Sequence, residues 1–342
     1  MTLTEMTLDQ RRHLIDTEQV WQAWDGARRR VSGHNGTLGW KSVSGREYLV
    51  RVDGPAARRK ARSLGPRSPD TERILHDFTM GKQRAREAFA GTSVRLREMA
   101  RMSRALRLAR VPLPAAKIVR VLHRRGALGR NVTVAGTNAI YAYEAAAGVF
   151  VGTDMLATGD LDILLDSRRK LGLRGDEDSP VLMDMLRDAD RSFSKVGAQG
   201  FRAVNADGYQ VDLIKPTPHD VVFSKEADTL GPGDDLRAAH IPNMRWVANA
   251  PKFEAMAIGA DGLPVPLVCP DPRAFALYKL WMGSMDATRD PVKRVRDVQQ
   301  AHAVAAIINE HYPLLPFRPE HLACFPRRAA DLGADADFFR LS

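Results

Sequence analysis

Three aspartates in the middle of the chain stand where a carboxylate is costly unless it has a partner. Asp160 and Asp162 alternate with apolar residues in the segment GDLDILLD. In a β-strand both carboxylates would leave the same face, with their Cα atoms roughly 6.5 Å apart. That spacing lets both contact a pair of cations about 3.5–4 Å apart. Asp212 has a similar position within the apolar run QVDLIKP, where an unpaired carboxylate costs free energy.

These carboxylates predict a divalent cation. Two carboxylates so close repel each other, and a cation between them would offset that repulsion. Oxygen-only ligands favour Mg²⁺ or Mn²⁺ over zinc. The chain has two cysteines, Cys269 and Cys324, with no CxxC and no clustered histidines, which argues against a zinc site or a disulfide framework and fits a reducing cytoplasm. A DxD on an exposed turn is the alternative, but the apolar continuation ILL favours a buried strand.

A glycine-led helix start precedes the DxD segment. The β-branched run VTV (132–134) leads to Gly136 and Thr137, and a helix is expected from there to Gly148, which suits a C-terminal cap. Gly136 lets another group approach the backbone closely, and Thr137 can cap the helix with its hydroxyl. The open amides at such a start can bind phosphate. Taken alone, Gly-Thr before a helix more often marks only a tight turn.

The third aspartate lies on an expected hairpin. Asp207–Gly208 separates two alternating runs, which predicts a hairpin whose return strand carries Asp212. Two strands thus each place carboxylates in apolar surroundings, downstream of the glycine-led helix start. Together they indicate phosphate and metal chemistry. The chain has no GxSxG, Walker loop or GxGxxG, so α/β-hydrolase, P-loop and Rossmann interpretations have no support.

The order of these motifs resembles the DNA-polymerase-β-like nucleotidyltransferase superfamily. Within it, the segments GTNAIYAYEAAAGV, ATGDLDILLD and GYQVDLIKP look like a little-characterised bacterial branch of nucleotidyltransferase-fold proteins, and so do GREYLVR and RSLGPRSPDTE nearer the N-terminus. The chain is also loosely similar to abortive-infection nucleotidyltransferase toxins. It departs from the superfamily in the 22 residues between Thr137 and Asp160, a longer spacing than many members have.

The resemblance implies roles for particular residues. Asp160 and Asp162 would hold two magnesium ions, or manganese in their place. Asp212 would hold the second ion and help deprotonate an attacking hydroxyl. The nucleoside triphosphate would be bound through its phosphates by three consecutive residues and by a lysine on a later helix: Gly136, Thr137, Asn138 and Lys279. A lone lysine on an apolar helix also fits simple snorkelling of the ammonium toward water.

The fold expected is α+β: a polymerase-β-like core with a mixed sheet, flanked by helical regions. We predict a basic, mainly helical region with a small hairpin at 1–128, the nucleotidyltransferase core at 129–225 and a mainly helical region at 226–342. The pattern predicts a helix over 5–31, a hairpin over 36–54, a polar loop over 56–72 and a helix from Asp70 or Thr71, either of which would cap it, to about 110. Residues 1–130 contain 28 Lys and Arg and 12 Asp and Glu, which gives a net charge of +16. Residues 131–342 have a net charge of −6.

The leading functional hypothesis is transfer of a nucleoside monophosphate from a nucleoside triphosphate to a hydroxyl. The basic first region favours RNA as acceptor, for example a transfer-RNA end, although a solvated helical surface would have the same composition. A protein side chain accepting AMP is the second choice and a small molecule the third. A non-catalytic protein that binds RNA or a protein partner on the same fold is a further alternative, as is a DNA-binding regulator using residues 70–128. With no signal peptide and no membrane span in the sequence, we expect a cytoplasmic protein without a membrane partner.

Overall fold

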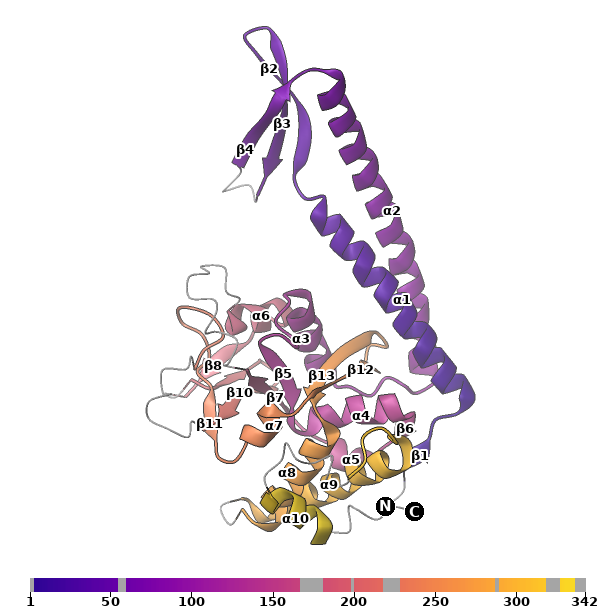
Figure 1. The fold of residues 1–342 in the computed structure, drawn as a ribbon, viewed down its shortest axis with the longest axis vertical. Coiled ribbons are helices and arrows are strands. Elements are labelled where there is room, and N and C mark those ends of the chain that lie inside the picture. Colours follow the sequence, from indigo (N-terminus) through magenta and orange to yellow (C-terminus); the bar gives the residue numbers. More distant parts are fainter. Residues whose placement is uncertain are drawn as a thin grey trace. The chain divides into compact units, whose positions relative to one another are not determined.

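The computed structural model describes residues 3–54, 60–166, 181–197, 200–217, 228–286, 289–317 and 327–335. The chain forms two compact units (Figure 1). The smaller unit is Arg12–Ala105, and the larger unit combines Met1–Arg11 with Leu106–Ser342. No helix among the described residues has the length and apolar content needed to cross a membrane.

Two long helices and a three-stranded antiparallel sheet form the smaller unit. The helices are α1 (Leu8–Gly33) and α2 (Pro69–Ala105), and the sheet has the order β2 (Thr37–Val43), β3 (Arg46–Asp53), β4 (Lys60–Pro66). Aromatic rings join the helices: Trp24 lies 4.9 Å from Trp21 and 5.9 Å from Phe89, between ring centroids. The Trp24 indole N–H also donates to Ser93 at 3.0 Å.

The hairpin predicted over 36–54 is confirmed. Ser44 and Gly45 both have positive φ angles, 51° and 78°, as a tight two-residue turn between twisted strands requires. The polar loop predicted over 56–72 is wrong for residues 60–66, which form β4 and pair with β3. The register shifts between Leu49 and Val50, and this irregularity lets a segment containing Gly65 and Pro66 join the sheet edge.

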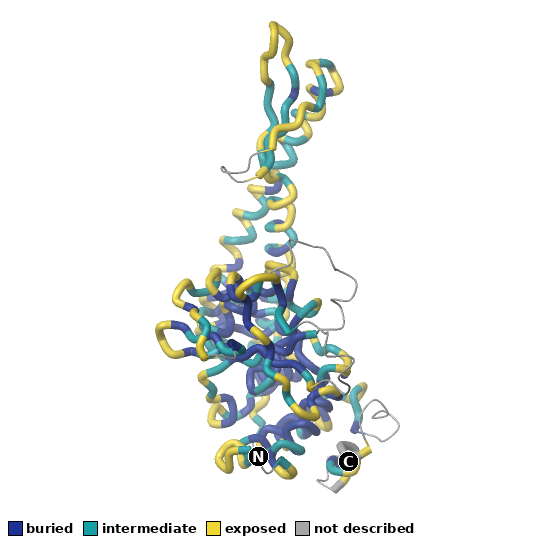
Figure 2. Tube along the Cα trace, turned by 90° about the vertical axis from the view of Figure 1, so that its left-hand side faces the viewer, coloured by how far each residue is buried: buried dark blue, intermediate teal, exposed yellow. Residues whose placement is uncertain are grey.

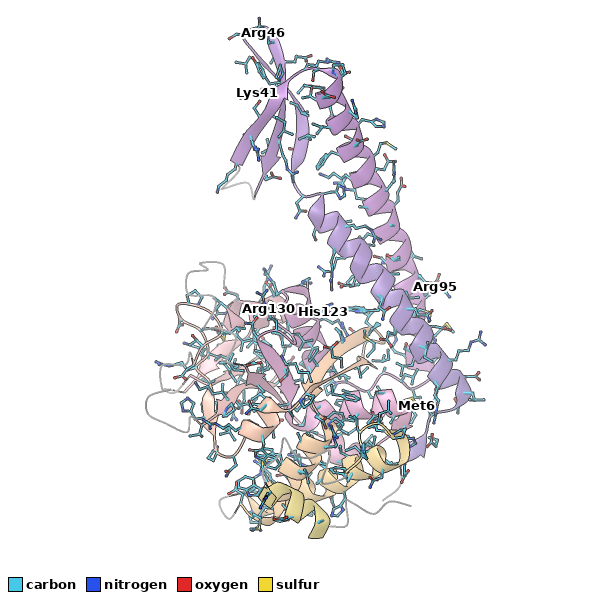
Figure 3. The ribbon with its side chains drawn as sticks, viewed as in Figure 1. Met6, Lys41, Arg46, Arg95, His123 and Arg130 are labelled. Carbon is cyan, nitrogen blue, oxygen red and sulfur yellow. The ribbon has the colours of Figure 1, made fainter. Side chains whose placement is uncertain are left out.

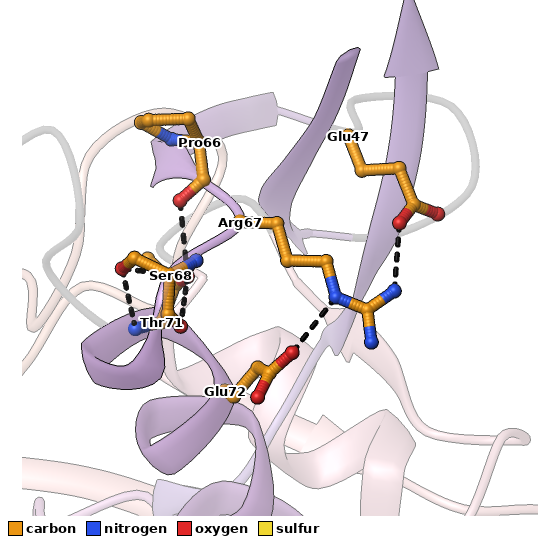
Figure 4. A network of polar contacts seen from close by, with 6 residues as sticks. All are labelled: Glu47, Pro66, Arg67, Ser68, Thr71 and Glu72. Atoms are coloured by element: carbon orange, nitrogen blue, oxygen red, sulfur yellow. Dashed lines mark hydrogen bonds and ion pairs between the residues drawn. The ribbon is translucent and has the colours of Figure 1, made fainter. Parts of the chain in front are cut away.

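The start of α2 differs from prediction by two residues. Ser68, rather than Asp70 or Thr71, is the N-cap: its hydroxyl accepts the Thr71 N–H at 3.3 Å, and the Thr71 hydroxyl accepts the Ser68 N–H at 2.8 Å (Figure 4). Pro69 then takes the first helical position, where a missing N–H costs nothing. Beside this cap, Arg67 contacts Glu47 of β3 at 2.7 Å and Glu72 of α2 at 2.8 Å, which links the sheet to the helix.

A six-stranded mixed sheet is the centre of the larger unit. Its order is β5 (Val132–Ala135), β7 (Asp160–Leu165), β10 (Gln210–Pro216), β9 (Arg202–Val204), β8 (Ser194–Val196), and β11 (Ala239–Ile241) pairs in parallel with the end of β10. β10 is parallel to β7 and antiparallel to β9, while β5 is antiparallel to β7. This sheet and the surrounding helices confirm the α+β prediction.

Two smaller strand pairs and eight helices among the described residues complete the larger unit. The strand pairs are β1 (Thr4–Glu5) with β6 (Val149–Phe150) and β12 (Lys252–Ile258) with β13 (Pro264–Pro270). The helices are α3 (Leu113–Arg124), α4 (Ile140–Ala147), α5 (Thr153–Leu156), α6 (Leu182–Ala189), α7 (Arg245–Asn249), α8 (Pro272–Ser284), α9 (Pro291–His311) and α10 (Arg327–Asp335). A 3₁₀ turn, Gly136–Ala139, connects β5 to α4.

The core lies between this sheet and its helices. In Figure 2 the buried residues gather in the larger unit, whereas the long helices and small sheet are mostly intermediate or exposed. Ile118 and Leu122 of α3 are fully buried in the same core as Ile163 of β7 and Leu213 of β10. The division into three regions at 128 and 225 stays a prediction. Helix α3 belongs to the first of these regions, yet it is buried in the same core as β7 and β10 of the second.

Capping residues determine where α8 and α9 begin and where α4 ends. The Asp271 and Asp290 carboxylates cap α8 and α9 by accepting backbone N–H groups at 2.8 Å and 2.9 Å, each followed by a proline. Gly148 ends α4 in the left-handed conformation, with φ 70° and ψ 37°, as predicted.

Candidate active site

The sheet brings the three predicted aspartates together on adjacent strands. Asp160 and Asp162 alternate along β7 with buried residues, as predicted, and the Asp207–Gly208 turn joins β9 to β10. In the parallel pairing of β7 with β10, Asp212 lies directly beside Asp162, and Gln210 lies beside Asp160. Neighbouring strands are about 4.8 Å apart, so Asp162 and Asp212 project side by side from one face. The sequence placed them on two strands but could not show that these strands are neighbours.

The surroundings of Asp162 disfavour its ionised form. Its pKa is raised to about 6, mainly by burial and then by the negative charge of Asp160, with a smaller contribution from Asp212. Lys279 opposes this shift. A carboxylate that is hard to ionise beside two others is the environment in which a bound cation gains most.

Gly136 is required beside this carboxylate. Its φ angle is +60°, and a Cβ at this position would overlap the Oδ2 atom of Asp162. Any other side chain would therefore displace Asp162 or the turn. The prediction that Gly136 allows close approach is confirmed, and the approaching group is the carboxylate itself.

Asp160 is fixed through its backbone as well as its side chain. Its carbonyl oxygen accepts hydrogen bonds from the Asn138 side-chain amide at 2.8 Å and from the Tyr209 hydroxyl at 3.2 Å. The Thr158 hydroxyl donates to the Asp160 carboxylate. Asn138, predicted as a nucleotide-binding residue, thus connects the 3₁₀ turn to the start of β7.

Asp212 is held by Arg202 of the neighbouring strand. The Arg202 guanidinium donates to both carboxylate oxygens of Asp212, each at 2.6 Å, and the two residues are register partners across β9 and β10. Such a bidentate pair fixes the plane of the carboxylate and neutralises its charge. The sequence analysis missed Arg202, although it could have been found: residues 202 and 212 are equidistant from Asp207 at the predicted turn.

The carboxylates have the chemistry of a divalent-cation site. No group of three or more His, Cys, Asp or Glu side chains in the described part of the chain is arranged so that it could hold a metal ion. Arg202 occupies both oxygens of Asp212. Asp160 and Asp162 are an adjacent pair of hard oxygen donors, and burial together with the charge of Asp160 raises the pKa of Asp162. Carboxylate oxygens are the ligand type that Mg²⁺ and Mn²⁺ prefer.

Lys279 is buried in α8 rather than snorkelling to the surface. Its ammonium lies 2.7 Å from Asp297 of α9, and Arg289 contacts the other oxygen of that carboxylate at 2.8 Å. Burial lowers the pKa of Lys279. Burial acts to raise the pKa of Asp297, but the charges of Lys279 and Arg289 hold it below its ordinary value. Both cations also act on Asp162, so this network borders the carboxylates.

Gln300 of α9 connects the 3₁₀ turn to the long segment before β7. Its side-chain amide donates to the Thr137 hydroxyl at 3.2 Å and to the Met155 carbonyl at 2.6 Å. Arg296, one turn earlier, donates to the Ala157 carbonyl at 3.2 Å. The prediction that the Thr137 hydroxyl caps a helix is wrong, since neither the 3₁₀ turn nor α4 has a side-chain cap and this hydroxyl accepts from Gln300. No local signal in the sequence pointed to Gln300.

One of three comparisons with known proteins identifies a family for this chain. A family model described as Nucleotidyltransferase matches residues 114–319, which contain all seven predicted site residues. No curated protein and no solved structure gives a significant match to the chain. The family match covers more than half of the chain, from α3 through the sheet to the helix that carries Asp297 and Gln300. The chain therefore belongs to this nucleotidyltransferase family and is a nucleotidyltransferase enzyme.

Proposed function

We propose that the protein transfers a nucleoside monophosphate from a nucleoside triphosphate to the hydroxyl of an RNA acceptor. As a member of this family it takes a nucleoside triphosphate as substrate, and such enzymes generally use a divalent metal. The observation that carries the proposal is the register of β7 and β10, which pairs Asp162 with Asp212 next to the Gly136 turn. The order of the motifs supports placing the site in the polymerase-β-like superfamily.

The proposed chemistry needs positioning and charge neutralisation more than a covalent intermediate. The acceptor oxygen attacks the α-phosphorus, the bond from that phosphorus to the bridging β-oxygen breaks, and pyrophosphate leaves. The hydroxyl proton passes to a carboxylate of the site, for which we propose Asp212. The backbone amides of the Gly136–Ala139 turn and the charge of Lys279 would hold the triphosphate.

Mg²⁺ or Mn²⁺ would be held by Asp160 and Asp162, with Asp212 as a third ligand once it is released from Arg202. When bound, the metal supplies positive charge to the phosphate oxygens and to the attacking oxygen. Three features of the chain support this assignment: the hard oxygen donors, the raised pKa of Asp162 and the glycine that leaves Asp162 space.

RNA is favoured as the acceptor by the charge of the N-terminal region. Residues 1–130 carry 28 Lys and Arg against 12 Asp and Glu. A polyanion is attracted to such a region, whereas a cationic small molecule is not. AMP transfer to a protein side chain is the alternative that the assay below distinguishes.

The test is incubation of the full chain with each α-³²P nucleoside triphosphate, Mg²⁺ and total bacterial RNA. Asp160→Asn removes one proposed metal ligand. Asp154→Asn is the matched control, because Asp154 is exposed in the same segment. We expect label on RNA with the parent and with Asp154→Asn, and none with Asp160→Asn. Label on protein would replace the RNA acceptor with a side chain. Equal label with Asp160→Asn would refute the proposed site.

A further inference from the structure

The charge of the chain is divided unequally between its two units. Arg12–Ala105 holds 20 of the 51 Lys and Arg residues but only 10 of the 41 Asp and Glu residues, so this unit has a net charge of +10 and the remainder is neutral. The net excess of positive charge is thus carried by the helical pair and the small sheet. The larger unit is neutral as a whole, although its residues 106–130 contain seven Lys and Arg and no Asp or Glu.

Four arginines form a stripe along the second half of α2: Arg86, Arg97, Arg101 and Arg104. At 100° per residue they fall within about 60° of one another around the helix, and at 1.5 Å per residue they span about 27 Å. All four are exposed, and no described carboxylate forms an ion pair with them. We define these four residues as the arginine stripe.

The two acidic residues of the same stretch lie at one edge of the arginine stripe and are paired with residues outside it. Between positions 86 and 104 the acids are Glu87 and Glu98. Glu98 pairs with Arg95 at 3.3 Å, and Glu87 accepts a hydrogen bond from Gln83 at 2.9 Å. An ordinary solvated helix face mixes the two signs in pairs three or four residues apart. Glu98 stands three residues before Arg101, but its carboxylate is paired with Arg95, so the charge of the arginine stripe is left available to a partner.

We propose that the arginine stripe is the surface that holds the acceptor RNA by its phosphate backbone. Guanidinium groups bind phosphate oxygens in a bidentate manner and remain charged at every physiological pH. A row of such groups that form no ion pair with described carboxylates matches a chain of regularly spaced phosphates, and contacts to phosphates do not depend on the base sequence. This inference rests on the proposed function, because it identifies where the acceptor of that reaction is bound.

The experiment compares two double variants of the full chain that change the net charge equally. Arg97→Glu with Arg101→Glu reverses half of the arginine stripe. Arg84→Glu with Arg95→Glu is the control, because these exposed residues lie about 140° around α2 from the middle of the stripe. Arg95 is labelled in Figure 3. Circular dichroism and thermal unfolding establish that both variants are folded.

Binding is measured by fluorescence anisotropy with a labelled 20-nucleotide single-stranded RNA at several salt concentrations. Losing two phosphate contacts should flatten the slope of log K against log [salt] by about 1.4. We expect the stripe variant to bind at least 10-fold more weakly, and the control to bind within threefold of the parent. Equal losses in the two variants would overturn the proposal. Binding to phosphatidylserine vesicles without binding to RNA would replace it with a membrane surface.

Nucleotide transfer separates this proposal from the proposed function. If the parent transfers label to RNA and the stripe variant does so equally well at limiting RNA, nucleotide transfer to RNA is supported. The arginine stripe is then refuted as the surface that holds the acceptor RNA. If the parent binds RNA through the stripe but transfers no nucleotide to it, the surface stands and the proposed reaction fails.

Discussion

Arg202 and Asp212 face each other across β9 and β10, with both carboxylate oxygens accepting hydrogen bonds of 2.6 Å from one guanidinium. A group proposed to hold a metal is therefore already neutralised by a protein cation. The pair keeps Asp212 oriented while the nucleotide and metal are absent. A divalent ion that uses Asp212 must compete with Arg202, which leads to a first prediction.

Arg202→Gln should tighten binding of Mn²⁺. It frees the Asp212 carboxylate and removes a positive charge beside two further carboxylates, and a gain of about 1.4 kcal/mol would appear as about a 10-fold lower Kd. Electron paramagnetic resonance of free Mn²⁺ measures this directly. Arg191→Gln makes the same charge change at an exposed position and should leave the Kd unchanged. An unaltered Kd for Arg202→Gln would remove Asp212 from the metal site.

Asp162→Asn should stabilise the metal-free protein and abolish its activity. Burial and the charge of Asp160 disfavour the ionised carboxylate, so a neutral amide of the same shape relieves a cost of up to about 3 kcal/mol. Urea unfolding at pH 7.5 in EDTA should show this gain, while transfer of label falls at least about 100-fold. Loss of both stability and activity would indicate a structural role instead.

The parts of the site that follow from local patterns could be predicted from sequence. Alternation placed Asp160 and Asp162 on one strand face, and the Asp207–Gly208 turn placed Asp212 on a return strand. These features depend on residues a few positions apart. The same holds for Gly148, whose left-handed conformation ends α4.

The parts that depend on distant segments could not be predicted in this way. Gln300 and Thr137 are 163 positions apart and meet only because α9 packs beside the 3₁₀ turn. The residues around Lys279 in the sequence do not indicate that its ammonium pairs with the carboxylate of Asp297. β4 was missed because Gly65 and Pro66 are poor strand residues, and a register irregularity in its pairing with β3 accommodates them.

Gln300→Leu should weaken nucleotide binding. The substitution leaves the Met155 carbonyl without its donor and frees the Thr137 hydroxyl, at a cost of about 1–3 kcal/mol for the unsatisfied group. Since we propose that this turn positions the phosphates, we expect KM for the nucleoside triphosphate to rise about 10-fold, with a smaller change in kcat. Gln299→Leu is the control, since Gln299 is exposed on the same helix. Equal effects of the two variants would contradict the role of Gln300.

His13 should make the smaller unit sensitive to acid. It is buried between α1 and α2, where its Nε2 lies 2.9 Å from the Ser103 hydroxyl, and burial lowers its pKa below the ordinary value of 6.5. The unfolded chain therefore binds the proton more readily than the folded chain, so stability is full above pH 6.5 and falls as the pH drops below it.

Hydrogen exchange of peptides from α1 and α2 between pH 7.5 and 5 reports this loss, after correction for the intrinsic pH dependence of exchange. His13→Gln should flatten the profile in that window, whereas His76→Gln, at an exposed position, should leave it as in the parent. A parent profile that is flat over the same range would show that His13 does not control the stability of the helical pair.

Lys279 and Asp297 allow a structural role to be separated from nucleotide binding. Lys279→Met leaves the Asp297 carboxylate in a buried site with Arg289 alone, and Asp297→Leu leaves the Lys279 ammonium buried without its closest counter-ion. Each single variant should lose about 3–5 kcal/mol of stability. The double variant Lys279→Met with Asp297→Leu should recover most of that loss, because the charge it leaves without Asp297 is that of Arg289, whose side chain is 28% exposed and can reach water. If Lys279 also holds the triphosphate, transfer of label stays low in the double variant although urea unfolding shows its stability restored. Recovery of transfer together with stability would show that the pair serves only to hold α8 against α9.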